Sequence, residues 1–138
     1  MSQSLGLICL VVREYDEALA YFCGTLGFER VEDRDIPEQD KRWVVIKPPG
    51  ASGGAQVLLA RASTVQQQAR IGDQTGGRVA LFLYTDDVHG DHDRLSRRGV
   101  AFTRPPTAYP YGTAAVFRDL YGNLWDLVQL HPQPGPNC

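Results

Sequence analysis

The feature that most constrains the fold is an internal repeat with an offset of 72 residues. This offset carries the apolar run Ile8–Val12 onto Ala80–Tyr84, and it carries Trp43–Ile46 onto Ala115–Arg118. A repeat that occurs only twice predicts a pseudo-symmetric pair of modules rather than a solenoid.

The first module is expected over residues 1–61. Residues 5–12 form an apolar run that predicts a strand buried on both faces. A helix should follow, capped by Asp16 and ended by Gly27, with an apolar stripe made of Ala18, Leu19, Phe22 and Leu26. Three further strands are predicted at 28–36, 42–46 and 56–60, and the first of them is rich in charge.

The polar stretch 62–77 is expected to connect the modules, and 78–131 to form the second one. Residues 78–84 predict another buried strand, and 86–99 a polar helix with Val88 and Leu95 turned inward. The remaining strands are predicted at 100–112, 113–118 and 124–130, and 132–138 form a Pro-rich tail.

Each half therefore has the order strand, helix, strand, strand, strand, which predicts an α+β fold of two tandem βαβββ modules. Open sheets leave unpaired edges. We expect the two sheets to join edge to edge or to close against a second chain, so a homodimer is the expected assembly.

Bulk composition excludes several partners. The net charge is −2 and no basic block is present, so neither nucleic acid nor a membrane surface is an expected partner. The longest apolar run, LGLICLVV, is too short to span a bilayer, and no signal peptide is expected. The cysteines are odd in number and not closely spaced: Cys9, Cys23 and Cys138. This pattern fits reduced thiols, which predicts a cytoplasmic protein.

Four stretches carry a resemblance to a known family: DEALAYFCGTLGF, FLYTDDVHGDHDRLSRRGVAF, YPYGTAAVF and RDLYGNLWDLVQ. The chain resembles the vicinal oxygen chelate (VOC) superfamily, which contains glyoxalase I, bleomycin-resistance proteins and extradiol dioxygenases. The Asp-x-x-Gly-Asn of the last stretch is the most specific element. The resemblance covers about residues 4–131 and implies one VOC domain with sheets curling round a cavity, commonly in a dimer.

Metal-dependent members of that family place four ligands, usually His or Glu, in the cavity. The resemblance matches these positions to Leu7, to Leu58 or its neighbour Leu59, to Ala80 or its neighbours Val79 and Leu81, and to Asp126. Asp126 alone has a side chain that can bind a metal ion. We therefore expect no cofactor, and a divalent metal is disfavoured.

Asp126 lies in the apolar run LWDLVQL, and its role is open from sequence. Strand alternation puts Asp126 on one face with Leu124 and Val128, and the other face carries Trp125, Leu127 and Gln129. The resemblance assigns the first face to the cavity. Three interpretations remain: a metal ligand, a direct ligand contact, and a solvated or structurally paired acid.

Five more residues are candidate ligand contacts. Trp43, Tyr109 and Tyr111 offer flat rings that suit planar ligands, although core packing or a dimer seam is an equal alternative. Gln56 lies near the metal position of the first module and offers an amide. Cys9 shares strand parity with Leu7, although a buried small side chain explains it better than a reactive thiol.

Other polar side chains are weaker candidates for a metal or ligand site. His89 and His92 have the i, i+3 spacing of a helix-surface metal site, but we expect His92 to be half-buried packing and His89 to face solvent. Arg42, Arg78 and Arg118 are candidates to pair with Asp126 or to clamp an anion, and surface charge is the default interpretation for each.

Three functional hypotheses follow. The first is a metal-independent small-molecule-binding protein of the bleomycin-resistance type, which the vacant ligand positions favour. The second is a metal-dependent lyase, isomerase or dioxygenase of the glyoxalase type, of which a metal-free enzyme with Asp126 as general base is a variant. The third is a structural or regulatory dimer whose cavity is vestigial.

Overall fold

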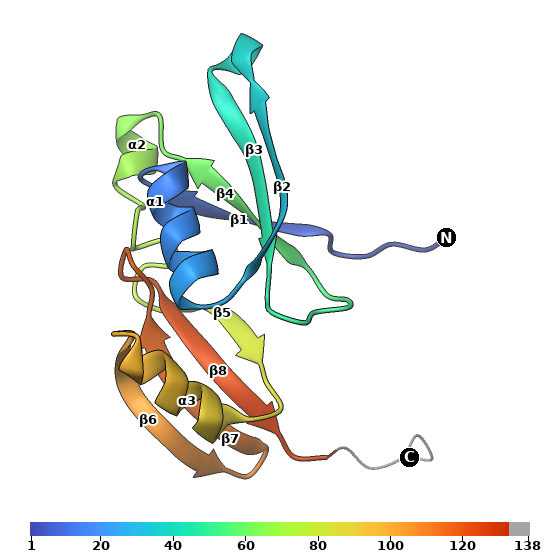
Figure 1. The fold of residues 1–138 in the computed structure, drawn as a ribbon, viewed down its shortest axis with the longest axis vertical. Coiled ribbons are helices and arrows are strands. Elements are labelled where there is room, and N and C mark those ends of the chain that lie inside the picture. Colours follow the sequence, from blue (N-terminus) through green and yellow to red (C-terminus); the bar gives the residue numbers. More distant parts are fainter. Residues whose placement is uncertain (133–138) are drawn as a thin grey trace. The chain divides into compact units, whose positions relative to one another are not determined.

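A computed structural model describes residues 1–132, so most of the expected Pro-rich tail, with Cys138, lies outside the described residues. The chain divides into two compact units, Met1–Gln74 and Thr75–Cys138, called here the first and second unit (Figure 1).

The first unit contains a four-stranded sheet with the order β1-β4-β3-β2. The strands are β1 (Leu7–Val12), β2 (Glu29–Ile36), β3 (Lys41–Lys47) and β4 (Gln56–Arg61). β1 and β4 are parallel, whereas β3 is antiparallel to both of its neighbours. Short helices complete the unit: α1 (Tyr15–Leu19), η1 (Ala20–Thr25), η2 (Pro37–Gln39) and α2 (Val65–Gln68).

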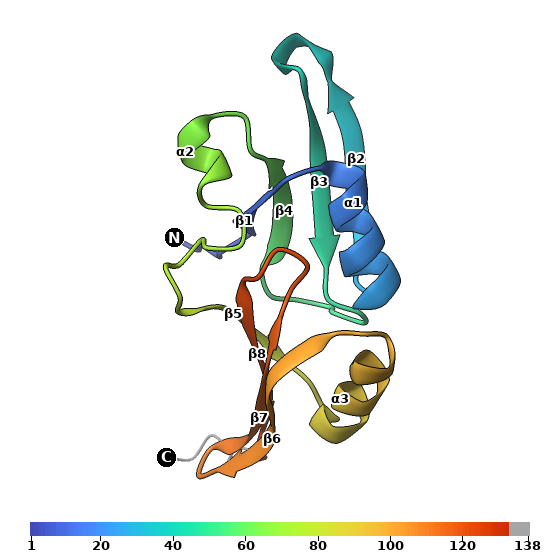
Figure 2. The ribbon, with the colours of Figure 1, turned by 90° about the vertical axis from the view of Figure 1, so that its left-hand side faces the viewer.

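One face of this sheet packs against α1 and η1, and the core lies there (Figures 1 and 2). The fully buried residues on the two sides of this interface include Leu10, Val44, Leu59, Ala18 and Phe22. The opposite face, which α1 and η1 do not cover, is called the open face. The prediction that the first strand is buried on both faces is therefore wrong, because alternation turns Leu7 and Cys9 to the open face, where both are exposed.

The first helix begins one residue before the predicted cap. Glu14 occupies the cap position without a side-chain hydrogen bond, and Asp16 lies inside the first turn. The Asp16 carboxylate instead accepts a hydrogen bond from Arg42, so the long-range ion pair replaces the predicted cap. After Leu19 the helix widens into a π-helix, η1, which ends at Thr25, and Gly27 follows with a φ of 83°, which suits glycine.

The second unit repeats this topology with the strand order β5-β8-β7-β6. The strands are β5 (Val79–Tyr84), β6 (Ala101–Tyr109), β7 (Gly112–Arg118) and β8 (Leu124–Leu130), and the helix is α3 (Val88–Arg97). The pairing is again parallel between β5 and β8 and antiparallel elsewhere. The predicted repeat and the α+β fold of two βαβββ modules are confirmed, and each sheet is open rather than closed into a barrel.

α3 lies along one face of the second sheet (Figure 2). Val88 and Leu95 turn inward as predicted, and they meet the face that carries Trp125 and Leu127. β5 is not buried on both faces, contrary to the prediction. Phe82 is 61% exposed, because it lies on the face opposite α3, which is the open face of this sheet.

No helix in residues 1–132 is long and apolar enough to cross a membrane.

Candidate ligand-binding site

The first unit carries a cavity of about 330 Å³ at the end of the sheet where β3 begins and β4 ends, and it is lined both by side chains of the open face and by Tyr15 and Arg42. Cys9 on β1 pairs in register with Leu58 on β4, and both line the cavity beside Trp43 of β3. Val11 and Ala60 extend the same apolar floor. Alternation in three adjacent strands thus places small and aliphatic side chains next to one aromatic ring.

The other end of this cavity is polar. Its lining includes Lys41 and Arg61, together with the polar side chains of Gln39, Ser63 and Gln67. The Arg61 guanidinium donates to the carbonyl oxygen of Asp40 over 2.9 Å and lies 3.9 Å from a carboxylate oxygen of Glu14. The cavity therefore combines an apolar floor with several hydrogen-bonding groups, which is the composition of a small-molecule site.

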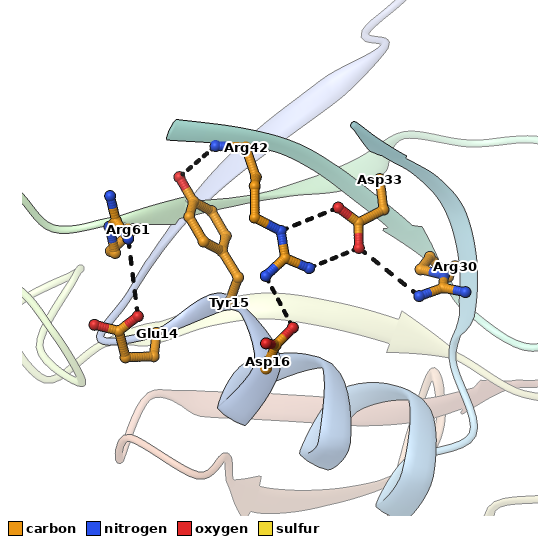
Figure 3. A network of polar contacts seen from close by, with 7 residues as sticks. All are labelled: Glu14, Tyr15, Asp16, Arg30, Asp33, Arg42 and Arg61. Carbon is orange, nitrogen blue, oxygen red and sulfur yellow. Dashed lines mark hydrogen bonds and ion pairs between the residues drawn. The ribbon is translucent and has the colours of Figure 1, made fainter. Parts of the chain in front are cut away.

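A network of charges holds β2 and β3 against α1 beside the cavity (Figure 3). Arg42 makes a two-pronged contact with Asp33, at 3.1 and 2.7 Å, and donates to Asp16 over 2.8 Å. The hydrogen bond from Arg42 holds the pKa of the Asp33 carboxyl below its usual value, and the pKa of Arg42 is raised in turn.

Tyr15 contributes both its ring and its hydroxyl to this network. Its ring lies under two guanidinium groups, those of Arg42 and Arg61, each 5.2 Å from the ring centroid. Its hydroxyl accepts from the backbone N–H of Arg42 over 3.3 Å. Arg42 is thus engaged inside the first unit, which removes it as a free clamp for a ligand anion.

In the second unit, Asp126 lies in the middle of the open face. Its register neighbours are Phe82 on β5 and Val116 on β7, and Arg104 pairs with Val116 from β6. The Asp126 oxygen Oδ1 is buried and has no hydrogen-bond partner among the described residues. Burial raises the pKa of Asp126, and the positive charge of Arg104 offsets part of that rise.

Two stacked tyrosines lie near this carboxylate. The rings of Tyr109 and Tyr111 are parallel within 1°, with centroids 5.4 Å apart. Arg104 donates to the Tyr109 hydroxyl over 3.1 Å. Burial raises the pKa of Tyr111, and the charge of Asp126 raises it further, so Tyr111 and Asp126 share one electrostatic environment.

The structure thus collects the sequence candidates into two groups. Cys9 and Trp43 line the first-unit cavity, whereas Gln56 pairs with Leu7 and does not line it. Tyr109, Tyr111 and Asp126 gather in the second unit.

Sequence reasoning missed several residues of these groups. Phe82 could have been found, because the parallel pairing of the first and last strands of the module brings it beside Asp126. Arg104 could not have been found from the sequence, because two register shifts in β6 break the alternation that would show which face of the sheet its side chain lies on. Lys41 and Arg61 were missed because they stand at strand ends with no motif.

The residues present do not fit a divalent metal ion. Leu7, Leu58 and Ala80 have no donor atom in their side chains. No group of three His, Cys, Asp or Glu side chains that could hold a metal occurs within residues 1–132. His89 is exposed, and His92 packs its ring against Phe102 with centroids 4.5 Å apart, as predicted for both.

Asp119 organises the turn that leads into β8. Its Oδ1 accepts from the backbone N–H groups of Tyr121, Gly122 and Asn123, each over 3.0 Å. Its Oδ2 accepts from Nε1 of Trp125 over 2.9 Å and from the Asn123 amide over 3.3 Å. This buried carboxylate fixes the hairpin that carries Asp126.

Several known proteins are similar to this chain. A protein of Shewanella frigidimarina (strain NCIMB 400) is 55% identical over 131 residues, covering 95% of this chain and 96% of its own. The protein YurT of Bacillus subtilis (strain 168) is 31% identical and covers 87% and 94%.

Among solved structures, TnmS3, an antibiotic binding protein from Streptomyces sp. CB03234, matches with a TM-score of 0.73 and 28% identity, covering 94% of this chain and 98% of its own. A superfamily member from Sphaerobacter thermophilus DSM 20745 matches with a TM-score of 0.70 and 30% identity, covering 93% and 98%.

The family model of the Glyoxalase/Bleomycin resistance protein/Dioxygenase superfamily matches residues 4–127. This match covers most of the chain, and it agrees with the paired βαβββ units and with the Asp-x-x-Gly-Asn turn at Asp119. The chain belongs to the Glyoxalase/Bleomycin resistance protein/Dioxygenase superfamily.

Proposed function

We propose that the protein binds a small organic molecule without a metal ion. The observation that carries the proposal is the cavity of the first unit, with an apolar floor at Cys9, Trp43 and Leu58 and a polar end at Lys41 and Arg61. Its volume of about 330 Å³ lies at the small end of the range for ligand sites. Tyr109, Tyr111 and Asp126 of the second unit form a separate group of candidate ligand contacts.

The comparison with TnmS3 supports a binding role. That protein is described as antibiotic-binding, and it shares the fold with this chain over nearly the whole length of both. Fold alone does not determine function, so the main support for the proposal is the cavity.

A metal-dependent enzyme of the glyoxalase type is the weaker alternative. A divalent ion needs several protein ligands, and one carboxylate, that of Asp126, does not form such a set. Metal content after incubation with Ni²⁺, Zn²⁺, Mn²⁺ or Fe²⁺ and desalting separates the two hypotheses. Near-stoichiometric metal that disappears in Asp126→Ala would contradict the proposal.

Ligand binding can be followed by tryptophan fluorescence, because the chain has two tryptophans in different settings. Trp43 lines the cavity, whereas Trp125 is 2% exposed and packs on the α3 side of the second sheet. Flat aromatic compounds, antibiotics among them, are first screened by thermal shift. A compound that binds the cavity should quench the fluorescence, and the quenching should vanish in Trp43→Phe while the thermal shift persists.

A cavity-filling variant gives the decisive result. Leu58→Arg puts a long charged side chain on the cavity floor and should abolish the thermal shift. Leu120→Arg changes an exposed leucine in the turn between β7 and β8 and is the matched control. The proposal fails if no compound binds, or if every compound that binds does so equally well in Leu58→Arg.

We also propose that the protein is a homodimer. Among residues 1–132, both sheets have unpaired edges at their outer strands, β1 and β2 in the first unit and β5 and β6 in the second. Exposed edges favour pairing with another chain. Light scattering coupled to size-exclusion chromatography should give twice the chain mass of 15.3 kDa, and a monomer at micromolar concentration would refute the dimer.

A cytoplasmic location is part of the same proposal. Cys9 and Cys23 are both free thiols, and burial raises the pKa of Cys23. Free thiols suit a reducing compartment. Cell fractionation checks this location.

A further inference from the structure

We propose that the open face of the second sheet binds the positively charged part of a planar aromatic ligand, which stacks on the Tyr109–Tyr111 pair and forms an ion pair with Asp126. This inference rests on the proposed function, since it names the chemical class of the small molecule. Its argument comes from three features of the second unit alone.

The first feature is the unsatisfied carboxylate. Buried polar atoms in proteins almost always have hydrogen-bond partners, and an exception needs an explanation. Oδ1 of Asp126 is the buried side-chain atom without one among residues 1–132. Oδ1 itself is covered, but the residue as a whole is half-buried, so part of the carboxylate group is accessible from the open face.

The second feature is the position of the nearest cation. Arg104 lies two strands away from Asp126 in the same row of the sheet, yet its guanidinium donates to the Tyr109 hydroxyl. It contributes a distant charge to Asp126 but no hydrogen bond. An ionised carboxylate accepts hydrogen bonds and donates none, so the group that completes this site must be a donor.

The third feature is the aromatic surface. Tyr109 and Tyr111 form a stacked pair, Tyr111 is 49% exposed, and the ring of Phe82 is exposed beside Asp126. The faces of aromatic rings attract cations and also stack on flat rings. An acceptor and aromatic faces together favour a planar cation with N–H groups over a neutral or anionic molecule.

The test compares two flat dyes by fluorescence titration at pH 7.5. Proflavine is a planar cation with N–H donors, and acridine is a neutral ring system of similar shape without a donor. The wild-type protein should bind proflavine more tightly than acridine. Asp126→Asn, which keeps the shape but removes the charge, should weaken proflavine about tenfold or more and leave acridine nearly unchanged.

Further variants separate the contributions. Tyr111→Leu should weaken both dyes, because it removes the stacking surface. Asp86→Asn changes an exposed acid just after β5 and should alter neither. Thermal unfolding of each variant shows whether it is folded, and wild-type protein that binds proflavine no better than acridine overturns the inference without any variant.

The same titrations with Leu58→Arg test separately whether the cavity of the first unit binds the dye. Proflavine binding that is lost in Leu58→Arg but unchanged in Asp126→Asn would overturn this inference and leave the proposed function intact. Binding lost in Asp126→Asn and kept in Leu58→Arg would confirm the inference and refute the assignment of the first-unit cavity as the binding site.

Discussion

The carboxylate of Asp119 should be the polar group on which the second unit most depends. It is 5% exposed and accepts five hydrogen bonds, three through Oδ1 from backbone N–H groups and two through Oδ2 from Trp125 and Asn123. Trp125 and Asn123 are themselves buried, so water cannot replace the lost acceptor at their side chains. The substitution Asp119→Asn tests this dependence with almost no change in volume.

The amide of asparagine can keep only one oxygen in place. If that oxygen takes the position of Oδ1, the new NH₂ group faces the N–H of Trp125 and the amide of Asn123, so two hydrogen bonds become contacts between donors. A hydrogen bond to a charged group contributes roughly 1.5–3 kcal/mol, and unsatisfied buried donors cost about 1–3 kcal/mol. We expect Asp119→Asn to reduce the free energy of unfolding by about 2–4 kcal/mol, a large share of the roughly 5–15 kcal/mol typical of a domain.

The measurement is equilibrium unfolding in urea, followed by fluorescence in a Trp43→Phe background. Only Trp125 then reports, so the signal comes from the second unit. Asp86→Asn, at an exposed acid, is the control and should change the free energy of unfolding by less than about 0.5 kcal/mol. A value for Asp119→Asn within that same margin would refute the account of Asp119 as the centre of the turn.

Three further predictions follow from the geometry. Gly112→Ala should destabilise the second unit by roughly 1–3 kcal/mol in urea unfolding, because the added Cβ would lie 2.1 Å from the carbonyl oxygen of Gln129; an unchanged midpoint would contradict the tight approach. The lowered pKa of Asp33 means that its pairing with Arg42 stabilises the folded state above the ordinary pKa of an aspartate, and that this stabilisation is lost as the pH falls through the lowered value. Thermal unfolding between pH 7 and pH 2 should therefore depend less on pH in Asp33→Asn, and an equally steep dependence would exclude this pair. The raised pKa of Asp126 has the opposite effect on stability: the free energy of unfolding falls as the pH rises from the ordinary pKa of an aspartate through the raised value. Asp126→Asn should therefore raise the melting temperature at neutral pH. A lower melting temperature would show that the ionised carboxylate is well paired.

The order of elements was predictable because local patterns agree with the tertiary structure. Alternation predicted that Trp125 and Leu127 face the helix, and the apolar spacing of the second helix predicted Val88 and Leu95 as its inner residues. Gly27 and Gly99 end their helices with φ values of 83° and 87°, a conformation that glycine adopts without strain. These features depend on residues close in sequence, so they can be predicted without knowledge of the partner elements.

Burial of whole strands was not predictable in the same way. Residues 5–12 and 78–84 are apolar throughout, which is typical of strands covered on both sides. α1 and η1 cover one face of the first sheet and α3 covers one face of the second, so Cys9, Phe82 and Tyr84 on the other faces remain exposed. The number of layers on a sheet is a property of the assembled fold, and no pattern within one strand encodes it.

The sequence by itself determined the repeat, the two βαβββ units and the family, because each depends on spacing along the chain. The tertiary structure alone decided how the charged and polar groups pair. Asp16 has the residue type of a helix cap, yet it binds Arg42, which lies 26 positions further along the chain. Arg104 binds Tyr109 and leaves Asp126 without a hydrogen bond to its buried oxygen. The physical reason is that a side-chain hydrogen bond forms with whichever partner the packed backbone brings within about 3 Å, and that distance is set by strand register rather than by sequence separation.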